Sequence, residues 1–504
     1  MAKREQWGSR AGFILAAIGS AIGLGNIWRF PYTVAKNGGG AFLIAYFIAL
    51  ITAGIPLLIL EFGLGHKMRT SAPGIFGRLN TKWQKLGWWQ TLIAFAITIY
   101  YIAVVGWALR YVIFAFNLSW GSDTASFFNE SFLQITSSPF DFGGIRIDAL
   151  ITLFIIWAIN YVVLAFGIKG GIEKANKIFM PILLISVVII TVRGLTFEGA
   201  AMGLDYLFKP DFSKILDGRV WVAAYGQIFY SLSICFGIML AYSSYLPKKS
   251  DIVNNAFITA FGNCSFSLLS GICVFSILGN MAFNSGKKVA EVAEVGVGLA
   301  FKVFPNAING LPSFNKAFGV LFFLSLFFAG ISSSMSIIET TVSAITDKFG
   351  IKRIKSLSII CGIGFLFSTI YATGVGLYVL DIVDHFLNNY GVAVAGLIET
   401  ILIGWFFNLK SIREYVNPIS DFSIGNWWEL CIKIITPLIL GIMIIIKVTE
   451  DLRKPYGNYS IQALLIYGVG VIVFTIIVGF VISSFKGSNS FEESMKKGVR
   501  NNEF

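Results

Sequence analysis

Charged residues are scarce in this sequence. Asp, Glu, Lys and Arg make up 13% of its 504 residues, whereas 56% are hydrophobic. Soluble globular proteins carry about 25% charged residues, so the shortage excludes a soluble protein. Apolar runs of about 20 residues, long enough to cross the hydrocarbon core of a bilayer, recur from one end of the chain to the other. We interpret the chain as an all-α integral membrane protein that sits in a lipid bilayer.

Residues that bind transition metals or form disulfides are also few. The chain has two histidines, His66 and His385, which excludes a histidine-rich metal site. The five cysteines form no CxxC pair and lie in apolar runs, so we expect them to be buried as small hydrophobic residues: Cys235, Cys264, Cys273, Cys361 and Cys431. The HExxH, nucleophile-elbow and phosphate-loop motifs of enzymes are absent, and we do not expect an enzyme.

The apolar runs divide the chain into about twelve spans. They lie at residues 10–36, 41–66, 88–116, 149–166, 177–193, 220–245, 253–283, 317–346, 354–371, 388–407, 427–447 and 461–485. An even number of spans places both termini on one side, where Lys and Arg are denser. This bias predicts cytoplasmic termini in a multi-pass protein of the plasma membrane, the inner membrane of a bacterial cell. It also accounts for the net charge of +12 without a nucleic-acid partner.

Spans 1 and 6 are interrupted by small and polar residues in mid-membrane. Span 1 contains the run Gly23-Leu24-Gly25-Asn26, and span 6 contains residues 231–237, which read SLSICFG. Glycine and serine weaken a helix, and unwound backbone is tolerated in a membrane only where it is buried or lines a polar cavity. Two breaks five spans apart match an inverted repeat of five plus five helices. Close helix packing through small residues is the alternative.

Polar and ionisable side chains lie inside several spans, where each is costly and therefore a candidate for function. Hydroxyl, amide and freed carbonyl oxygens suit an alkali cation, and the N-terminus of a half-helix favours a carboxylate. The candidates are Asn26, Arg29, Asn263, Ser267, Ser332, Ser333, Ser334, Glu339, Asp384 and Glu399.

These segments resemble the neurotransmitter:sodium symporter family (solute carrier 6-like), which has the LeuT-type fold. The resemblance covers nearly the whole chain and is strongest at residues 19–31 (GSAIGLGNIWRFP), 37–42 (NGGGAF), 226–237 (GQIFYSLSICFG) and 327–334 (FFAGISSS). It implies a sodium-coupled symporter that imports an amino acid by alternating access. It also implies a single transporter domain over residues 1–504, with the first repeat at 10–193, the second at 220–407, helices 11 and 12 at 427–485, and cytoplasmic ends at 1–9 and 486–504.

The resemblance also implies site residues, position by position. A first sodium ion would bind the Ala21 carbonyl, Asn26, Ser231 and Asn263 together with the substrate carboxylate. A second would bind the carbonyls of Gly19, Ile22 and Ala329 and the hydroxyls of Ser332 and Ser333. The substrate would contact Ser20, Ala21, Leu24, Gly25, Ile97, Tyr101, Tyr230, Ser231, Ser233, Phe236, Ser333 and Ile337. Arg29 with Asp384 resembles the outer gate, and Arg4 with Asp347 the cytoplasmic latch.

Four further positions bear on specificity and structure. Monoamine members of the family have Asp where Gly23 stands, so a glycine leaves the first sodium ion to a carboxylate on the substrate and favours an amino acid. Cys235 replaces a common glycine in span 6, which leaves the size of the substrate side chain open. Glu61 and Glu399, also family positions, are interpreted as structural hydrogen-bond anchors.

Span 7 raises a hypothesis about chloride. It reads NCSFS at residues 263–267 and so resembles the chloride-dependent animal members. Two sodium ions beside a zwitterion need a nearby negative charge in a medium of low dielectric constant, and span 7 has no acidic residue to supply it. One chloride would bind Tyr46, Gln227, Ser231, Asn263 and Ser267. The alternative is that another group, such as Glu339, balances the charge.

Other functions remain open at this point. One is sodium- or proton-coupled uptake of another small zwitterion or osmolyte. The other is a non-transporting channel or receptor on the same fold, against which the intact sodium ligands argue. We expect two sodium ions, no organic cofactor, and a monomer or homodimer.

Overall fold

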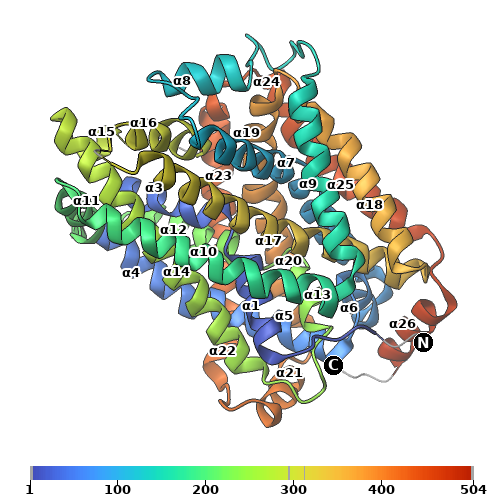
Figure 1. Ribbon diagram of the computed structural model, residues 1–504. Helices are drawn as coiled ribbons and strands as arrows, with labels where there is room; N and C mark the ends of the chain where they lie inside the picture. Colours follow the sequence, from blue (N-terminus) through green and yellow to red (C-terminus); the bar gives the residue numbers. More distant parts are fainter. Residues whose placement is uncertain (1–3, 293–295, 312, 501–504) are drawn as a thin grey trace.

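The computed structural model describes residues 4–292, 296–311 and 313–500. Residues 1–3 of the expected N-terminal segment and 501–504 of the expected tail lie outside this part. The described chain is helical, and its only extended pairing is an isolated bridge between Gly39 and Pro210. Long helices pack side by side, and the entry into α1 lies at the same end of the molecule as α26 (Asn489–Arg500) (Figure 1). We call this end the terminal end and the opposite one the outer end.

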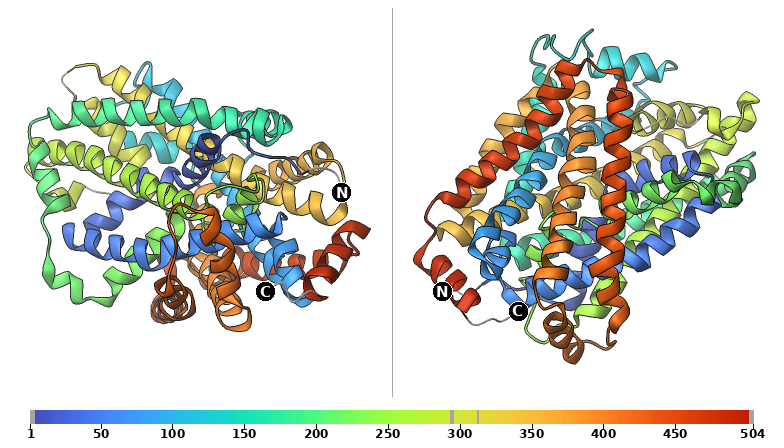
Figure 2. Two further views of the ribbon diagram at one scale, coloured as in Figure 1. Left: turned by 90° about the horizontal axis from the view of Figure 1, so that it is seen from below. Right: turned by 180° about the vertical axis from the view of Figure 1, so that it is seen from behind.

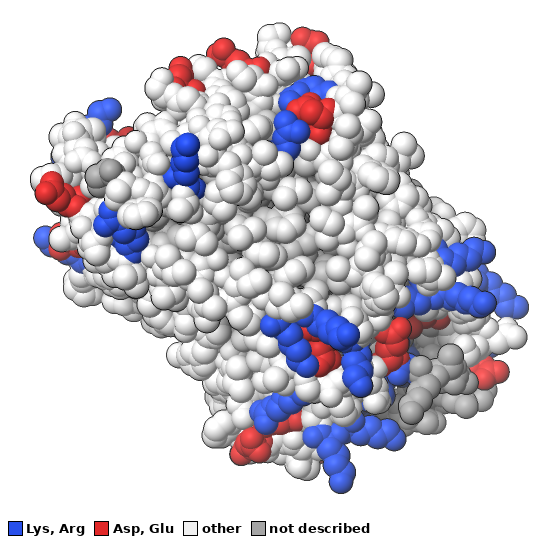
Figure 3. Space-filling model, viewed as in Figure 1, with Lys and Arg blue, Asp and Glu red and all other residues white. Residues whose placement is uncertain are grey.

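Ten helical stretches in the described residues are long and apolar enough to cross a membrane. They are Gly40–Met68, Thr81–Ala115, Ile147–Ala165, Ile168–Leu195, Ile252–Ser285, Asn315–Phe349, Arg353–Ala372, Gly376–Phe406, Asn426–Asn458 and Ile461–Ser484. The interrupted spans 1 and 6 bring the total to the twelve that the sequence predicts. On the face drawn in Figure 3, charged side chains gather at the two ends and leave a broad uncharged band between them. The protein is a multi-pass membrane protein.

The main helices of the described chain are the following. They are α1 (Arg10–Ala21), α2 (Leu24–Ile27), α3 (Arg29–Lys36), α4 (Gly40–Ala49), α5 (Ile55–Met68), α6 (Ala72–Leu79), α7 (Gln84–Ala115), α9 (Ile147–Ala165), α10 (Lys174–Leu195), α12 (Gly218–Ser231), α13 (Ile238–Ser243), α14 (Ile252–Ser285), α17 (Asn315–Phe349), α18 (Arg353–Ser368), α19 (Gly376–Phe386), α20 (Ala393–Ile401), α23 (Thr436–Arg453) and α25 (Gly470–Ser484). Shorter peripheral helices are α8 (Thr124–Ser126), α11 (Ala200–Phe208), α15 (Val289–Val292), α16 (Phe304–Asn309), α21 (Leu409–Val416), α22 (Asn426–Leu430) and α24 (Ile461–Ala463).

Spans 1 and 6 are broken, as the sequence predicts. In span 1, α1 ends at Ala21, Ile22 and Gly23 have extended backbones, and α2 begins at Leu24. In span 6, α12 ends at Ser231 and α13 begins at Ile238. Ser233 and Cys235 between them adopt φ values of 53° and 66°, in the left-handed region that only glycine occupies easily. The backbone of span 6 is therefore unwound over several residues, and surrounding groups must hold it in place.

The tenth span is longer than predicted. The sequence places its start at residue 388, whereas the structure continues the helix back to Gly376. Asp381 and Asp384 reduce the apolar character of this first part. The structure pairs both carboxylates with tyrosine hydroxyls, which lowers the cost of burying them. The extra turns place Asp384 inside a helix.

Burial separates central helices from peripheral ones. In its most apolar stretch, 78% of the residues of Asn315–Phe349 are buried, compared with 17% for Ile461–Ser484. Accordingly α25 and α23 lie on the outside of the molecule in the right-hand view of Figure 2. The central position of α17 brings it against α1 and α7, and this packing surrounds the break in span 1 with buried side chains.

Candidate functional site

One cluster of oxygens joins the end of α1 to α17. The Ser332 hydroxyl lies 2.9 Å from the Gly19 carbonyl oxygen and 3.0 Å from that of Ala329. The Ser333 hydroxyl lies 3.3 Å from the same Gly19 oxygen and 3.2 Å from that of Ile22. Both serines are buried. All five residues expected at a second sodium site are thus brought together, and their oxygens are the hard ligands that alkali cations prefer.

A second cluster lies on the other side of the break, between α2, α12 and α14. Asn26 Nδ2 donates to Asn263 Oδ1 at 2.8 Å, and Asn263 Nδ2 donates to Ser231 Oγ at 3.0 Å. The Asn263 atom that faces Asn26 also lies 3.2 Å from the Ala21 carbonyl oxygen and 3.3 Å from that of Ser231. The Asn263 amide can take two orientations. If its nitrogen faces Asn26, it donates to the carbonyls of Ala21 and Ser231. If its oxygen faces Asn26, that oxygen and the two carbonyl oxygens face one another, an arrangement that suits a cation.

The breaks of the two spans are tied together beside these clusters. Ser233 Oγ donates to the Ser20 carbonyl at 3.1 Å, and the Ser20 hydroxyl donates to Ser336 at 2.7 Å. The Leu24 amide, in the first turn of α2, donates to the Tyr101 hydroxyl at 3.2 Å. The peptide groups freed by the breaks are therefore met by side chains of α7 and α17 and by the opposite break.

A side chain at Gly23 would press against the Tyr101 hydroxyl and Ser333. A Cβ at this position would lie 2.9 Å from the Tyr101 hydroxyl and 3.2 Å from Ser333 Oγ. An aspartate here would have to displace Tyr101 or Ser333. The geometry therefore agrees with the absence of a carboxylate at this position.

The remaining expected substrate residues surround the same place. Ile97 lies one turn before Tyr101 on α7, and Ile337 lies one turn after Ser333 on α17; both are buried. Phe236, in the break of span 6, is 6% exposed. Tyr230 packs on the other side, where its ring leaves no room for a Cβ at Gly25.

The expected outer pair is not formed in this conformation. The guanidinium of Arg29 lies over the ring of Tyr230, 4.3 Å from its centroid. Asp384 instead accepts hydrogen bonds from Tyr100 at 2.7 Å and from Asn388 at 2.8 Å. The aromatic face stabilises the cation and two donors stabilise the carboxylate, so each has a partner without the other.

The latch at the terminal end is formed. Arg4 Nη1 donates to both oxygens of Asp347, at 2.8 and 3.0 Å. Sequence reasoning missed two more donors to this carboxylate, the Thr70 hydroxyl at 3.0 Å and the Ser71 amide at 2.7 Å. Arg4 also lies over the ring of Tyr245, 4.7 Å from its centroid. One carboxylate therefore holds the N-terminal segment and the loop after α5 against α17.

The residues expected around chloride include buried donors without acceptors. The Tyr46 hydroxyl and both the nitrogen and the oxygen of the Gln227 amide have no hydrogen-bond partner among the described residues, and both side chains are 1% exposed. Ser231 and Ser267 lie around the Tyr46 hydroxyl. Ser267 accepts from Asn26 Nδ2 at 2.8 Å, which connects this group to the cluster that contains Asn263. Unpartnered buried donors fit an anion.

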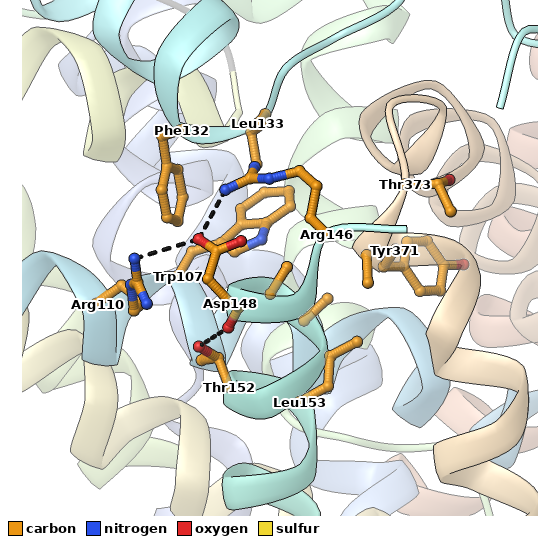
Figure 4. A pocket seen from close by; sticks show the side chains of 14 residues that line it. Trp107, Arg110, Phe132, Leu133, Arg146, Asp148, Thr152, Leu153, Tyr371 and Thr373 are labelled. Atoms are coloured by element: carbon orange, nitrogen blue, oxygen red, sulfur yellow. Dashed lines mark hydrogen bonds and ion pairs between the residues drawn. The ribbon is translucent and has the colours of Figure 1, made fainter. Parts of the chain in front are cut away.

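A cavity elsewhere in the molecule is separate from this site. It lies between α7, the start of α9 and residues 371–373, and in Figure 4 Arg110 and Arg146 both point to Asp148. The distances are 3.2 and 2.8 Å. Its volume of about 20 Å³ holds about one water molecule. None of the residues predicted to bind ions or substrate lines it.

The comparison with known families decides the class of protein. The model of the sodium:neurotransmitter symporter family matches residues 4–124 and 119–487. The chain belongs to this family. A relative in the family, an uncharacterized sodium-dependent transporter of Methanocaldococcus jannaschii, is 43% identical over 96% of this chain and 98% of its own length. The sodium-dependent dopamine transporter of Caenorhabditis elegans is 31% identical over 91% of this chain and 82% of its own length.

A solved structure of the family has the same fold. The crystal structure of MhsT in complex with L-phenylalanine matches with a TM-score of 0.76 and 30% identity, covering 88% of this chain and 99% of the MhsT chain. Family members with these names are sodium-dependent transporters and not enzymes. The chain is accordingly a sodium-coupled membrane transporter.

The latch gives a first prediction. Arg4→Ala removes the bidentate pair with Asp347 and the hydrogen bonds to Ser244. We expect a loss of about 1–2 kcal/mol of local stability, since the pair is partly screened by solvent. Hydrogen exchange of residues 7–12, followed by mass spectrometry, should accelerate by about 5–30-fold.

Arg219→Ala is the matched control, because it removes another Arg–Asp pair, the exposed one with Asp217 at 3.3 Å, and Arg219 lies outside the segment that is measured. Equal exchange of residues 7–12 in the two variants would show that Arg4 does not hold this segment.

Proposed function

We propose that this transporter is a symporter that uses the sodium gradient to import an amino acid by alternating access. The observation that carries the proposal is the pair of oxygen clusters, one on each side of Gly23. Both clusters lie beside the breaks of spans 1 and 6. A zwitterion between the breaks would place its carboxylate near the first cluster and the N-terminus of α2, which favours negative charge. MhsT, the related structure, was crystallised with an amino acid.

Two sodium ions are proposed, one in each cluster. The cluster of Ser332 and Ser333 supplies five protein oxygens and no charge. The cluster of Asn26, Ser231 and Asn263 supplies fewer, so the substrate carboxylate would complete it. This division makes substrate binding depend on sodium and couples the two fluxes, since a cation and a carboxylate that share a site stabilise each other.

The states of the two ends support an outward-oriented conformation. The latch of Arg4 and Asp347 closes the terminal end, which we place in the cytoplasm because Lys and Arg gather in its short loops. At the outer end Arg29 and Asp384 are apart. In alternating access the outer pair would form as the latch opens, so the plasma membrane never carries an open path through the protein.

Chloride is proposed as the balancing anion. The alternative acid, Glu339, is already neutralised, since it accepts from Arg353 Nη1 at 2.7 Å and from the Tyr245 hydroxyl at 2.7 Å. The Glu339 carboxylate is therefore not free to balance the charge of a sodium ion as well. The unpartnered Tyr46 hydroxyl and Gln227 amide would donate to chloride together with Ser231, Asn263 and Ser267.

The substrate class can be tested with purified protein. We expect at least one of the twenty amino acids to raise the melting temperature in sodium buffer and not in potassium buffer. A ligand at 100 times its Kd stabilises a protein by about 2.7 kcal/mol. Sodium-dependent uptake of the same compound into proteoliposomes should follow. If only decarboxylated amines or betaine-type osmolytes stabilise the protein, the amino-acid assignment is wrong.

The second sodium site can be tested by removing one ligand. Ser332→Ala deletes a hydroxyl that bridges α17 to the Gly19 carbonyl, and we expect a loss of about 1–2 kcal/mol in sodium binding. The sodium concentration for half-maximal uptake should rise about 5–30-fold.

Ser334→Ala is the matched control, because Ser334 is the same residue type two positions on and its hydroxyl bonds Asn160 on α9. A similar rise in both variants would contradict a specific role for Ser332.

Chloride dependence has a direct assay. Replacing external chloride with gluconate should depress uptake, since the charge near the first sodium ion is then unbalanced. Ser267→Glu supplies a fixed carboxylate at the same place and should make uptake independent of chloride, whereas Ser267→Ala should not. Unchanged wild-type uptake in gluconate would exclude the chloride site.

A further inference from the structure

Three metal-ligating side chains meet beside the break of span 6. Glu61 comes from α5, Glu399 from α20, and Cys235 from the break itself. One carboxylate oxygen of each glutamate and the Cys235 sulfur all lie within 4.8 Å of one another. All three residues are at most 1% exposed. They are not among the residues proposed above to bind sodium, chloride or substrate.

Several oxygens of this cluster lack a partner. The Cys235 amide donates to Glu61 Oε1 at 2.5 Å, and Gln90 Nε2 donates to Glu399 Oε2 at 2.6 Å. Glu61 Oε2, Glu399 Oε1 and Gln90 Oε1 have no hydrogen-bond partner among the described residues. Gln90 is fully buried and is held against the cluster by its bond to Glu399. Buried acceptors without a donor are satisfied by a shared proton, a water molecule or a cation, and the cysteine sulfur beside them favours the cation.

The Cys235 thiol lies close to the backbone of α20 because α20 has a glycine at the point of contact. A Cβ at Gly396 would lie 2.8 Å from Cys235 Sγ, so only glycine at this position lets the sulfur approach. Gly396 precedes Glu399 by three residues, close to one helical turn, and the two therefore lie on the same face of α20. The glycine and the glutamate together place sulfur and carboxylate side by side.

The donor set selects the kind of cation. Thiolate, carboxylate and amide oxygen together suit a thiophilic divalent ion, whereas Mg²⁺ and Ca²⁺ bind through oxygen alone. Ligands at about 2.0–2.3 Å from a tetrahedral metal are about 3.3–3.8 Å apart. The three ligand atoms, which lie within 4.8 Å of one another, would move closer together to reach that spacing.

We propose that Glu61, Cys235 and Glu399 bind a thiophilic divalent cation such as Zn²⁺ or Cd²⁺, with Gln90 Oε1 as a fourth ligand. Binding forms a metal–sulfur bond and releases the thiol proton to water. The two positive charges of the cation balance the thiolate and one carboxylate, while the other carboxyl keeps the proton held between the pair and binds through its carbonyl oxygen.

The bound cation would inhibit transport, a consequence that rests on the proposed function. In the alternating access proposed above, a core of spans 1, 2, 6 and 7 would rock against a scaffold of spans 3, 4, 8 and 9. Glu61 and Cys235 belong to spans 2 and 6 of this core, and Gln90 belongs to span 3 of the scaffold. A metal that bridges them fixes the break of span 6 to the scaffold. Binding itself depends only on the cluster.

Binding is tested on the purified full-length protein with Cd²⁺ alone. We expect Cd²⁺ to raise the melting temperature of the wild type and to produce the ultraviolet absorbance of a cadmium–thiolate bond. Cys235→Ser should lose both effects. Cys361→Ser, which changes another buried cysteine, should keep them, and Mg²⁺ should cause neither. Wild-type protein without either signal, or Cys235→Ser with both, would overturn the proposal.

Inhibition is tested in proteoliposomes as the ratio of uptake with and without Cd²⁺ for each variant. We expect the wild type and Cys361→Ser to lose most of their uptake and Cys235→Ser to keep most of its own. If Cd²⁺ raises the melting temperature of the wild type but does not reduce its uptake, the metal binds without bridging the moving part and the scaffold. The bridging role is then wrong, and the metal site stands. Should no amino acid be transported, the thermal and absorbance assays still decide the metal site.

Discussion

Peptide groups freed inside a membrane must find partners within the protein, and the rest of the structure depends on how this requirement is met. In span 1 the amides of Gly23 and Leu24 donate to Asn26 and Tyr101. In span 6 the amide of Cys235 donates to Glu61. Each break is therefore held by a residue from another helix or from its own half-helix. Without these partners the continuous helix would be the more stable arrangement.

The same polar side chains that satisfy the breaks also create the oxygen clusters that we propose to bind sodium. The single Ser333 hydroxyl lies within hydrogen-bond distance of the Gly19, Ser20 and Ile22 carbonyls at the end of α1. These contacts stabilise the unwound backbone and leave carbonyl oxygens gathered around hydroxyls. A fold that satisfies its freed peptide groups with oxygens has, in doing so, gathered the oxygens that the proposed second sodium site would use. Structure and function share their constraint here, which is why the breaks cannot be repaired without loss of the site.

The sequence predicted much of this architecture and less of its local detail. Composition indicated twelve spans, and the glycines near Gly23 with the serines of span 6 located both breaks. The ligand clusters followed from family resemblance, because oxygen types alone do not reveal which carbonyls converge. Two features depended on side-chain geometry that no pattern records. Arg29 lies over Tyr230 rather than beside Asp384, and span ten starts at Gly376 because tyrosines pair with its acidic residues.

Asp347 joins three segments that are far apart in the chain through a single carboxylate. Arg4, Thr70 and Ser71 all donate to its two oxygens. Losing one donor leaves the others aligned, so partial loosening gains little freedom while it still costs a bond. When Arg4 leaves, Thr70 and Ser71 still hold the carboxylate in place, so the acceptor stays aligned for the return of the N-terminal segment. The segment can therefore detach and rebind without the entropy cost of ordering Asp347 again.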